Sequence, residues 1–268
     1  MNMAGAVLVT GGSRRIGRSI SLTLASCGFN IVIQTRSKDD EVAILCNEIE
    51  SLGVTCFIVE GNLDNSDSVA GIFDDSIKLL ENNEMMLVGL VNSASMFEWD
   101  HPSNVKAESL LEHYRVNTMA PVLLSQMFYD LLISTSSNSL QENIPCIVNI
   151  LDQKLISPHP DHFSYTLSKQ ALSGATLMMA KAFAPICRVN SVSPGHVLPS
   201  TEQSSSGFEK AQNQSPLGYG PTPQDIADAV SFLFQARSIT AQNLVVDAGE
   251  HLLGRNRDVV FETEGLDD

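Results

Sequence analysis

Seven short apolar runs alternate with helix-length segments along almost the whole chain. The helix candidates lie near residues 15–27, 38–52, 66–81, 106–132, 161–184 and 223–235. Several of the runs are continuous enough to be strands that are buried on both faces, as in parallel sheets. This alternation predicts an α/β fold of the Rossmann type, a doubly wound parallel sheet flanked by helices. The expected strands are Ala6–Val9, Asn30–Gln34, Thr55–Val59, Leu87–Val91, Ile147–Leu151, Arg188–Val192 and Asn243–Val246.

No break in composition and no repeat of fixed period divides the 268 residues, so a single domain over 1–268 is expected. Two polar stretches interrupt the pattern. Ser134–Asn143 is expected to be a solvated loop. Ser200–Ser215 follows a strand on the ligand side, where either a solvated loop or a mobile lid would fit. A region at about 196–218 would then shape the substrate site, and the acidic C-terminal tail is expected to be peripheral.

Charge and composition exclude several classes of protein. A formal net charge of −15 argues against an extended nucleic-acid surface, so any anion site must be local. No stretch of about 18 uninterrupted apolar residues predicts a transmembrane span, and the start of the chain has no basic leader. The expected partner is a small-molecule substrate in the cytoplasm. The cysteines are odd in number and form no Cys-x-x-Cys pair, which predicts reduced thiols at Cys27, Cys46, Cys56, Cys146 and Cys187.

The stretch TGGSRRIG, Thr10–Gly17, lies where the first strand turns into the first helix. A strand, a glycine turn and a helix direct backbone N–H groups and the positive end of the helix toward a phosphate. Gly11, Gly12 and Gly17 supply the backbone freedom, whereas Arg15 stands where a dinucleotide fingerprint has glycine. A glycine turn alone is weak evidence for a nucleotide site.

The end of the second strand, QTRSKDD, indicates which dinucleotide would bind. A cofactor without a 2′-phosphate usually meets an acidic residue here, but this chain has Arg36 and Ser37. Arg36, with the nearby Arg14, predicts charge-assisted hydrogen bonds to a 2′-phosphate and therefore NADPH. An ordinary solvated charge is the alternative for Arg36.

A second cluster, YTLSK, places Tyr165 and Lys169 four residues apart on one face of a helix. An ammonium group beside a phenol can lower the phenol pKa from its usual value near 10. The pair therefore predicts a tyrosine that exchanges a proton near neutral pH, although this spacing also arises by accident on amphipathic helices.

Six ordered motifs together resemble the short-chain dehydrogenase/reductase family over nearly the whole chain. They are TGGSRRIG, NSAS at 92–95, VNTMAP at 116–121, IVNILD at 147–152, YTLSK, and VSPG at 192–195. The resemblance implies that Tyr165 is the proton donor, that Lys169 contacts the nicotinamide ribose and the tyrosine, and that Asn117 belongs to a water relay. It also implies cofactor contacts from Gly11, Arg14, Arg15, Ile16, Gly17, Arg36, Ser37, Asn62, Leu63, Asn92, Ala94, Ser95, Lys169, Pro194 and Gly195.

Two departures from the family pattern occur together, as they do in the pteridine reductase branch. Asp152 stands thirteen residues before Tyr165, where the family usually has serine, and Arg15 replaces a fingerprint glycine. The resemblance to this branch implies that Arg15 reaches from the cofactor phosphates to a pterin. It implies further that Ser95 touches cofactor and substrate and that Phe97 stacks on the pterin, so the substrate contacts would be Arg15, Ser95, Phe97, Asp152 and Tyr165.

Purely structural roles are the alternatives for these residues. Phe97 could be a core residue, and Asp152 could be a capped or salt-bridged carboxylate. His159 and His162 have a spacing that a metal could use, but no cluster of ligands accompanies them in the sequence, so no metal is expected.

The combined prediction is a cytoplasmic NADPH-dependent reductase of a pterin-type ring. The alternatives are a reductase of a ketone, 3-oxoacyl thioester or quinone, and a non-catalytic NADP-sensing protein on the same fold. The family resemblance implies a homotetramer in which the helices near 106–132 and 161–184 pair across two-fold axes.

Overall fold

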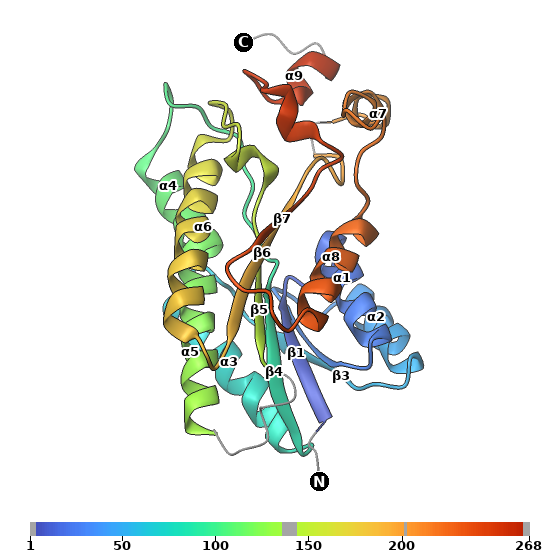
Figure 1. The fold of residues 1–268 in the computed structure, drawn as a ribbon, viewed down its shortest axis with the longest axis vertical. Coiled ribbons are helices and arrows are strands. Elements are labelled where there is room, and N and C mark those ends of the chain that lie inside the picture. The colour runs from blue at the N-terminus through green and yellow to red at the C-terminus, as the bar shows by residue number, and fades with distance from the viewer. Residues whose placement is uncertain (1–3, 136–143, 201–202, 265–268) are drawn as a thin grey trace.

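The computed structural model describes residues 4–135, 144–200 and 203–264, which form one seven-stranded parallel sheet (Figure 1). The strand order is β3-β2-β1-β4-β5-β6-β7. This arrangement confirms the predicted Rossmann-type sheet, and each predicted strand lies where it was expected. The strands are β1 (Ala4–Thr10), β2 (Asn30–Thr35), β3 (Cys56–Glu60), β4 (Met85–Asn92), β5 (Cys146–Ile150), β6 (Arg188–Pro194) and β7 (Asn243–Val246).

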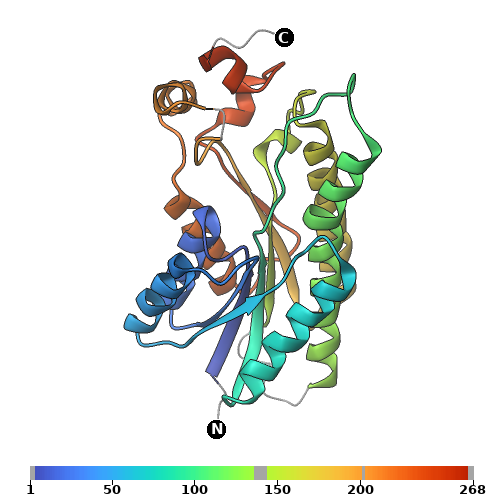
Figure 2. The ribbon, with the colours of Figure 1, turned by 180° about the vertical axis from the view of Figure 1, so that it is seen from behind.

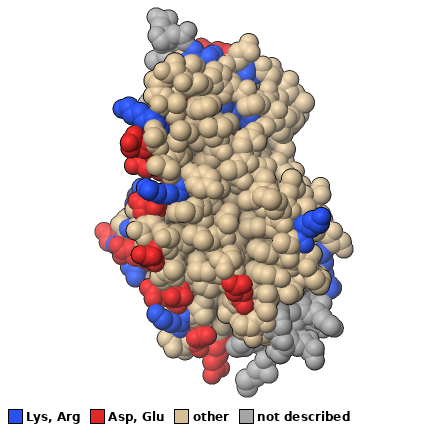
Figure 3. Space-filling model, turned by 90° about the vertical axis from the view of Figure 1, so that its left-hand side faces the viewer, with Lys and Arg blue, Asp and Glu red and all other residues tan. Residues whose placement is uncertain are grey.

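Helices cover both faces of the sheet (Figures 1 and 2). One layer contains α1 (Arg15–Ser26), α2 (Asp40–Ser51) and α8 (Pro223–Gln235). The opposite layer contains α3 (Ser66–Glu81), α4 (Ala107–Tyr114), α5 (Ala120–Ser134) and α6 (Phe163–Phe183). Uncharged side chains cover most of the middle of the outer face formed by this second layer (Figure 3).

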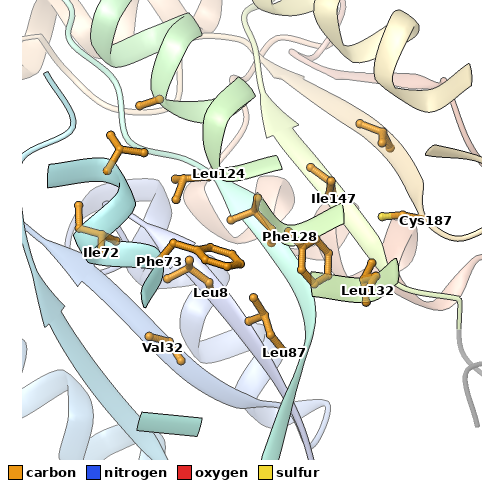
Figure 4. Close-up of a cluster of buried hydrophobic side chains, with 14 of the residues drawn as sticks. Leu8, Val32, Ile72, Phe73, Leu87, Leu124, Phe128, Leu132, Ile147 and Cys187 are labelled. Atoms are coloured by element: carbon orange, nitrogen blue, oxygen red, sulfur yellow. The ribbon is translucent and has the colours of Figure 1, made fainter. Parts of the chain in front are cut away.

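Strand β1 shows why its apolar run is continuous. Ala6 and Leu8 pack into the core under α3 and α5, whereas Val7 and Val9 pack into the core under α1, α2 and α8. Successive side chains of a strand point to opposite faces, so a strand that is covered on both sides needs apolar residues at every position. Figure 4 shows the first of these cores, in which Phe128 of α5 lies beside Leu132 and Ile147.

The strand order reverses direction between β1 and β4, because the chain leaves the edge strand β3 and returns to the other side of β1. Loops after these two strands diverge at the carboxyl edge of the sheet and leave a crevice there, which is where open α/β sheets bind ligands. The fold thus positions the ends of β1, β2, β4, β5 and β6 around one site.

The helix expected near 106–132 is interrupted. A π-helical turn at Arg115–Met119 separates α4 from α5 and contains the buried Asn117. By length and composition alone, the continuous stretch Ala107–Ser134 is apolar enough to cross a membrane. Its inner face, including Leu124 and Phe128, is fully buried in the core, as in a core helix.

The C-terminal third contains two short helices that the sequence did not suggest. Helix α7 (Ser205–Asn213) lies within the stretch expected to be loop or lid, and α9 (Val259–Glu264) packs against it. Ser204 at the start of α7 donates from its backbone N–H and its hydroxyl to Glu264. The prediction of a peripheral tail is therefore wrong as far as Glu264. Residues 136–143 of the first polar stretch and 201–202 of the second lie outside the described residues.

The prediction that all five cysteines are reduced is also wrong. A disulfide joins Cys46 of α2 to Cys56 of β3, with 5.4 Å between the two Cα atoms. Ten residues separate the two cysteines, and the packing of α2 against the following strand β3 brings them together; this spacing matches no Cys-x-x-Cys motif, so the sequence reasoning did not pair them. Cys27, Cys146 and Cys187 are free thiols.

Candidate active site

A cleft of about 1740 Å³ lies at the carboxyl edge of the sheet. It is bounded by the turn after β1, the ends of β2, β4, β5 and β6, the start of α6 and the C-terminal segment. Of the residues predicted from the sequence, the cleft is lined by Gly11, Arg14, Arg15, Ile16, Gly17, Arg36, Ser37, Asn62, Leu63, Ala94, Ser95, Phe97, Asp152, Tyr165, Lys169, Pro194 and Gly195. The other two, Asn92 and Asn117, are buried behind its wall.

Positive charge is concentrated in this cleft. Eight of the 16 lysines and arginines in the chain line it, although the chain as a whole carries a net charge of −15. Six acidic residues also line the cleft, so cations exceed acids there although acids dominate the chain as a whole, which suits a local anion site. The eight are Arg14, Arg15, Arg36, Arg115, Lys154, Lys169, Arg255 and Arg257.

The turn after β1 has the geometry of a phosphate cradle. Gly11 adopts a φ of +60°, which favours glycine, and a Cβ atom on Gly17 would lie 2.1 Å from the carbonyl oxygen of Gly11. At the N-cap of α1, Arg14 makes no side-chain capping bond, and the first turn has no acidic residue. The first N–H groups of α1 therefore suit an anionic ligand.

Arg15 adopts a φ of +50°, in the left-handed region that L-residues with side chains seldom occupy. Its exposed guanidinium donates to the carbonyl oxygen of Pro199, 3.3 Å away, in the chain that follows β6. Arg15 thus holds a backbone conformation that glycine adopts more readily, and its side chain spans from the phosphate turn to the loop after β6.

At the end of β2, the two cations predicted to bind a phosphate differ in their surroundings. Arg36 is exposed and lines the cleft. Arg14 forms an ion pair with Asp39, the N-cap of α2, and a second with Glu41 at 3.2 Å. Arg14 is therefore partly neutralised by acids that the sequence reasoning overlooked, and Arg36 is the better placed of the two.

Tyr165 and Asp152 form the chemical centre of the cleft. The Tyr165 hydroxyl donates to Oδ2 of Asp152 over 2.6 Å, while Oδ1 of Asp152 accepts from the backbone N–H of Lys154 and caps the 3-10 turn at 153–155. Burial, with the adjacent carboxylate, raises the pKa of Tyr165 well above 10. The prediction that Lys169 lowers this pKa is wrong, because Asp152 and not Lys169 contacts the hydroxyl.

Lys169 lies one helical turn beyond Tyr165, as the spacing predicted. Its ammonium group donates to the carbonyl oxygen of Ile150 over 2.8 Å and lies 5.8 Å from the centre of the Tyr165 ring. The side chain is almost fully buried, and burial lowers its pKa from 10.5 to about 8. A buried ammonium that faces the cleft can bind a ligand hydroxyl, and its lowered pKa lies close to neutral pH.

Phe97 lies beside this pair and is 47% exposed, so the alternative of a core phenylalanine is wrong. Its ring meets the Tyr165 ring edge-on at 4.7 Å and stacks on His162 at 4.0 Å. Ser95 precedes it in the same loop and donates to Oδ1 of Asn117 over 3.2 Å. An exposed aromatic face next to a buried proton donor suits a planar substrate.

The C-terminal segment contributes residues that the sequence reasoning missed. Arg255, Arg257, Asp258 and Phe261 line the cleft, and Arg257 forms an ion pair with the fully buried Asp161 at 2.9 Å. These contacts join positions almost a hundred residues apart, so no local motif could reveal them. Within residues 4–135, 144–200 and 203–264, no group of three or more His, Cys, Asp or Glu side chains could hold a metal.

Comparison with known proteins identifies the family. Residues 11–251 match the enoyl-(acyl carrier protein) reductase family. Among solved structures, the chain is similar to FolM alternative dihydrofolate reductase 1 from Brucella canis complexed with NADP, with 32% identity, coverage of 93% of this chain and 94% of that one, and a TM-score of 0.81.

Two further relatives are more distant in sequence. One is 3-oxoacyl-(acyl-carrier-protein) reductase FabG of Staphylococcus aureus strain Mu50, which is 26% identical over 94% of this chain and 100% of its own. The other is dihydromonapterin reductase of Enterobacter sp. strain 638, which is 24% identical over 92% of this chain and 96% of its own. The chain therefore belongs to the short-chain dehydrogenase/reductase family and is an oxidoreductase of that family.

Proposed function

We propose that the protein is an NADPH-dependent reductase of a pterin-type ring. The observation that carries this proposal is the hydrogen bond between Tyr165 and Asp152, next to the exposed face of Phe97. Two of the relatives, named as a dihydrofolate reductase and a dihydromonapterin reductase, act by name on reduced pterin rings.

The residues present suit NADPH. Gly11 and Gly17 let the turn pack closely at the start of α1, whose first N–H groups suit a pyrophosphate, and the exposed Arg36 suits a 2′-phosphate. Pro194 and Gly195 at the end of β6 would border the nicotinamide, and the ammonium of Lys169 would hold its ribose. When bound, NADPH supplies the hydride that reduces a C=N bond.

Reduction of a C=N bond also requires a proton at nitrogen, and the Tyr165–Asp152 pair is suited to supply it. Because its pKa is raised, Tyr165 is protonated at neutral pH and has a proton to donate. Asp152 fixes the orientation of the Tyr165 hydroxyl. A carboxylate accepts hydrogen bonds from ring N–H groups and can relay a proton through water, which the hydroxyl of a serine does less forcefully.

The substrate end supplies orientation. Phe97 offers a flat apolar face, and the Arg15 guanidinium can meet both the cofactor phosphates and polar atoms of the ring. Holding a ring between fixed groups lowers the entropic cost of reaching the reactive arrangement. The roles of these residues are thus those implied by the pteridine reductase branch.

A reductase of a 3-oxoacyl thioester or another ketone is the second candidate, since the FabG relative bears such a name. Asp152 argues against it, because that chemistry usually uses serine at this position. A non-catalytic NADP-sensing protein is the third, and the bonded Tyr165–Asp152 pair argues against it.

The test follows NADPH oxidation spectroscopically with a panel of dihydropterins, dihydrofolate, quinones, simple ketones and 3-oxoacyl thioesters. Turnover of a dihydropterin at a kcat/KM at least tenfold above every ketone is the expected result. Preference for a ketone or thioester would establish the second candidate. Tight NADPH binding without turnover of any compound would establish the third.

The proposed assembly is a cytoplasmic homotetramer. The outer face of α4 and α6 carries exposed apolar side chains, including Leu111, Tyr114, Leu177 and Met178, on a surface with few charges in its middle (Figure 3). Such a surface suits pairing across a two-fold axis. Multi-angle light scattering at micromolar concentration should give four times the chain mass of 29.0 kDa, and a monomer would contradict the proposal.

A further inference from the structure

Buried side chains hold the peptide groups on both sides of Phe97. Asn117 accepts from the backbone N–H of Met96 over 2.7 Å and donates to its carbonyl oxygen over 2.9 Å. The N–H of Glu98 donates to Nε2 of His113 over 3.3 Å, and Nδ1 of His162 donates to the Glu98 carbonyl oxygen over 3.1 Å. Phe97 is thus an exposed residue between two neighbours whose backbone groups are held by buried side chains.

The partners of the two histidines determine where their protons lie. Nδ1 of His113 faces the carbonyl oxygen of Ser109 at 2.8 Å, so Nδ1 carries the proton and Nε2 is free to accept from Glu98. Nδ1 of His162 also faces a carbonyl oxygen and must donate. Burial lowers the pKa of His162, which keeps the ring neutral at pH 7. Two neutral imidazoles therefore hold the backbone N–H and the carbonyl oxygen of Glu98, which belong to two successive peptide groups.

His162 does more than bond to the loop, because its ring stacks on Phe97. The two rings lie 4.0 Å apart with an angle of 22° between their planes, while Tyr165 meets the Phe97 ring edge-on. His162 is almost fully buried and Phe97 is 47% exposed. The stack thus has a fixed inner layer and an accessible outer layer in the cleft.

His162 keeps this position against a backbone preference. It is the N-cap of α6 with a φ of +52°, a conformation that histidine and asparagine adopt more readily than most residues do. The C-terminal segment supports it, since Asp161 accepts from Nε of Arg257 and from the N–H of Asp258. Asp258 places a carboxylate oxygen 3.8 Å from Nε2 of His162.

We propose that His162 is a positioning residue that presets the Phe97 ring as a stacking wall for a planar heteroaromatic substrate. The inference rests on the proposed function, because it assumes that a pterin-type ring contacts Phe97. The inference adds that the Phe97 ring is already in position before the substrate binds and that the C-terminal segment helps to hold His162 in place. A preset wall spares the cost of ordering Phe97 on binding, so its loss should weaken binding of a planar ring and leave the chemical step unchanged.

The test compares His162→Asn with the native protein and with two further variants. Asparagine tolerates the left-handed backbone but has no ring, so the loop loses its stack without new strain. His162→Phe keeps a ring for stacking and should restore most of the affinity. Phe232→Asn, which removes an exposed ring on α8 outside the cleft, is the matched control and should behave as the native protein.

Three measurements are made on each variant: the Kd of an oxidised pterin from its own fluorescence in the presence of NADP⁺, steady-state KM and kcat for the matching dihydropterin, and the thermal midpoint. For His162→Asn we expect Kd and KM to rise about fivefold to tenfold, with kcat within about twofold. A matching rise in the KM of a small ketone would argue for a general loss of shape rather than a lost stack and would overturn the inference.

Native affinity in His162→Asn would also overturn it. If His162→Asn does not fold, Phe97→Leu gives the deciding result, because it removes the aromatic outer layer from an exposed position and must weaken pterin binding by a similar factor. Failure of the proposed function has a different signature, since the native protein would then neither bind nor reduce any pterin. Loss of kcat with unchanged Kd would place His162 in the chemistry and contradict a positioning role.

Discussion

The two ends of the cleft are built by different means. The phosphate end consists of two turns, after β1 and β2, whose glycine backbone and exposed arginines suit an anion. The substrate end consists of side chains from the loop after β4, the start of α6 and the C-terminal segment, joined by buried hydrogen bonds. At the first end, affinity comes from backbone shape and charge. At the second, it comes from long-range packing.

This contrast has energetic consequences. Exposed cations such as Arg36 interact weakly with the rest of the protein because solvent screens them, so replacing one changes ligand affinity and little else. Buried polar groups such as Asp161 and His113 have partners whose loss costs folding free energy as well as activity. Substitutions at the two ends should therefore separate binding effects from stability effects.

The largest effect is expected at Asp152. Asp152→Ser can still cap the 3-10 turn through its hydroxyl, but it removes the carboxylate at the Tyr165 hydroxyl. Together with burial, that carboxylate raises the pKa of Tyr165. We expect kcat for a dihydropterin to fall by about 10²–10³-fold, with turnover of a simple ketone kept or improved. Steady-state kinetics with both substrates measures this.

Asp152→Asn is the matched control, because it keeps the size of the side chain and cannot ionise. It should lose pterin turnover as Asp152→Ser does, without gaining activity on ketones. Equal proportional losses of pterin and ketone turnover in both variants would remove the reason to separate this chain from the general carbonyl reductases.

Arg36→Asp should give the second largest effect and is confined to the phosphate end. A carboxylate there repels a 2′-phosphate and can bind a ribose diol, so we expect the ratio of kcat/KM for NADPH over NADH to fall by about a hundredfold, reversing the preference. The thermal midpoint should not move, because Arg36 is exposed. Arg14→Asp is the comparison; since Arg14 already pairs with Asp39, a smaller change in the ratio is expected. A native protein that used both cofactors equally well would contradict the assignment.

Lys169→Met replaces the ammonium that is proposed to hold the cofactor ribose, and the expected result is a rise in the free energy of unfolding at pH 7. Burial lowers the folded-state pKa of Lys169 to about 8 from 10.5, so below pH 8 the folded protein carries a charge that would be better solvated in the unfolded chain. Removing that charge should stabilise the fold by about 1–2 kcal/mol at pH 7. Between pH 8 and 10.5 only the unfolded state keeps the proton, so native stability rises relative to the variant and the difference closes.

Urea unfolding of both proteins from pH 7 to 10 measures this difference. Lys169→Arg, which keeps the charge, should show no stabilisation. A Met variant less stable than the native protein at pH 7 would mean that the bond from Lys169 to Ile150 outweighs the cost of burying the ammonium.

The sequence was sufficient to predict the fold and many of the residues that line the cleft, and the reason differs from residue to residue. Strands that are buried on both faces appear in the sequence as short continuous apolar runs, and Gly11 or Tyr165 belongs to a short motif whose spacing fixes geometry. The partner of Tyr165 was predictable from an offset of thirteen residues, but the direction of its pKa shift was not, because burial and the reach of Asp152 depend on tertiary packing.

Contacts between distant segments could not be predicted in this way. The ion pair of Asp161 with Arg257 and the packing of α7 against α9 join positions that only the folded chain brings together. The Cys46–Cys56 disulfide spans only ten residues, but it too depends on how α2 packs against β3. Arg14 is an intermediate case: its motif was recognised, but its acidic partners 25 and more residues away were not. The substrate end is made mostly of such contacts, which is why the sequence described it least completely.

The smallest effect, and the one that joins the two ends, is expected at Arg15. Arg15→Gly removes a side chain from a φ of +50°, which relieves about 1 kcal/mol of backbone strain, while the added freedom of glycine in the unfolded chain offsets a similar amount. We expect stability within about 0.5 kcal/mol of native and NADPH affinity within about threefold, because the glycine cradle is intact.

The KM for a pterin should rise about threefold to tenfold, because the cation that reaches the loop after β6 is lost. Arg15→Ala loses the same cation but keeps both the strain and the lower unfolded-state freedom of a residue with a side chain, so it should show the same rise in KM and also stay within about 0.5 kcal/mol of native stability. Cofactor titration, pterin kinetics and thermal unfolding of the two variants separate these causes, and a large loss of NADPH affinity in Arg15→Gly would place Arg15 in the phosphate end alone.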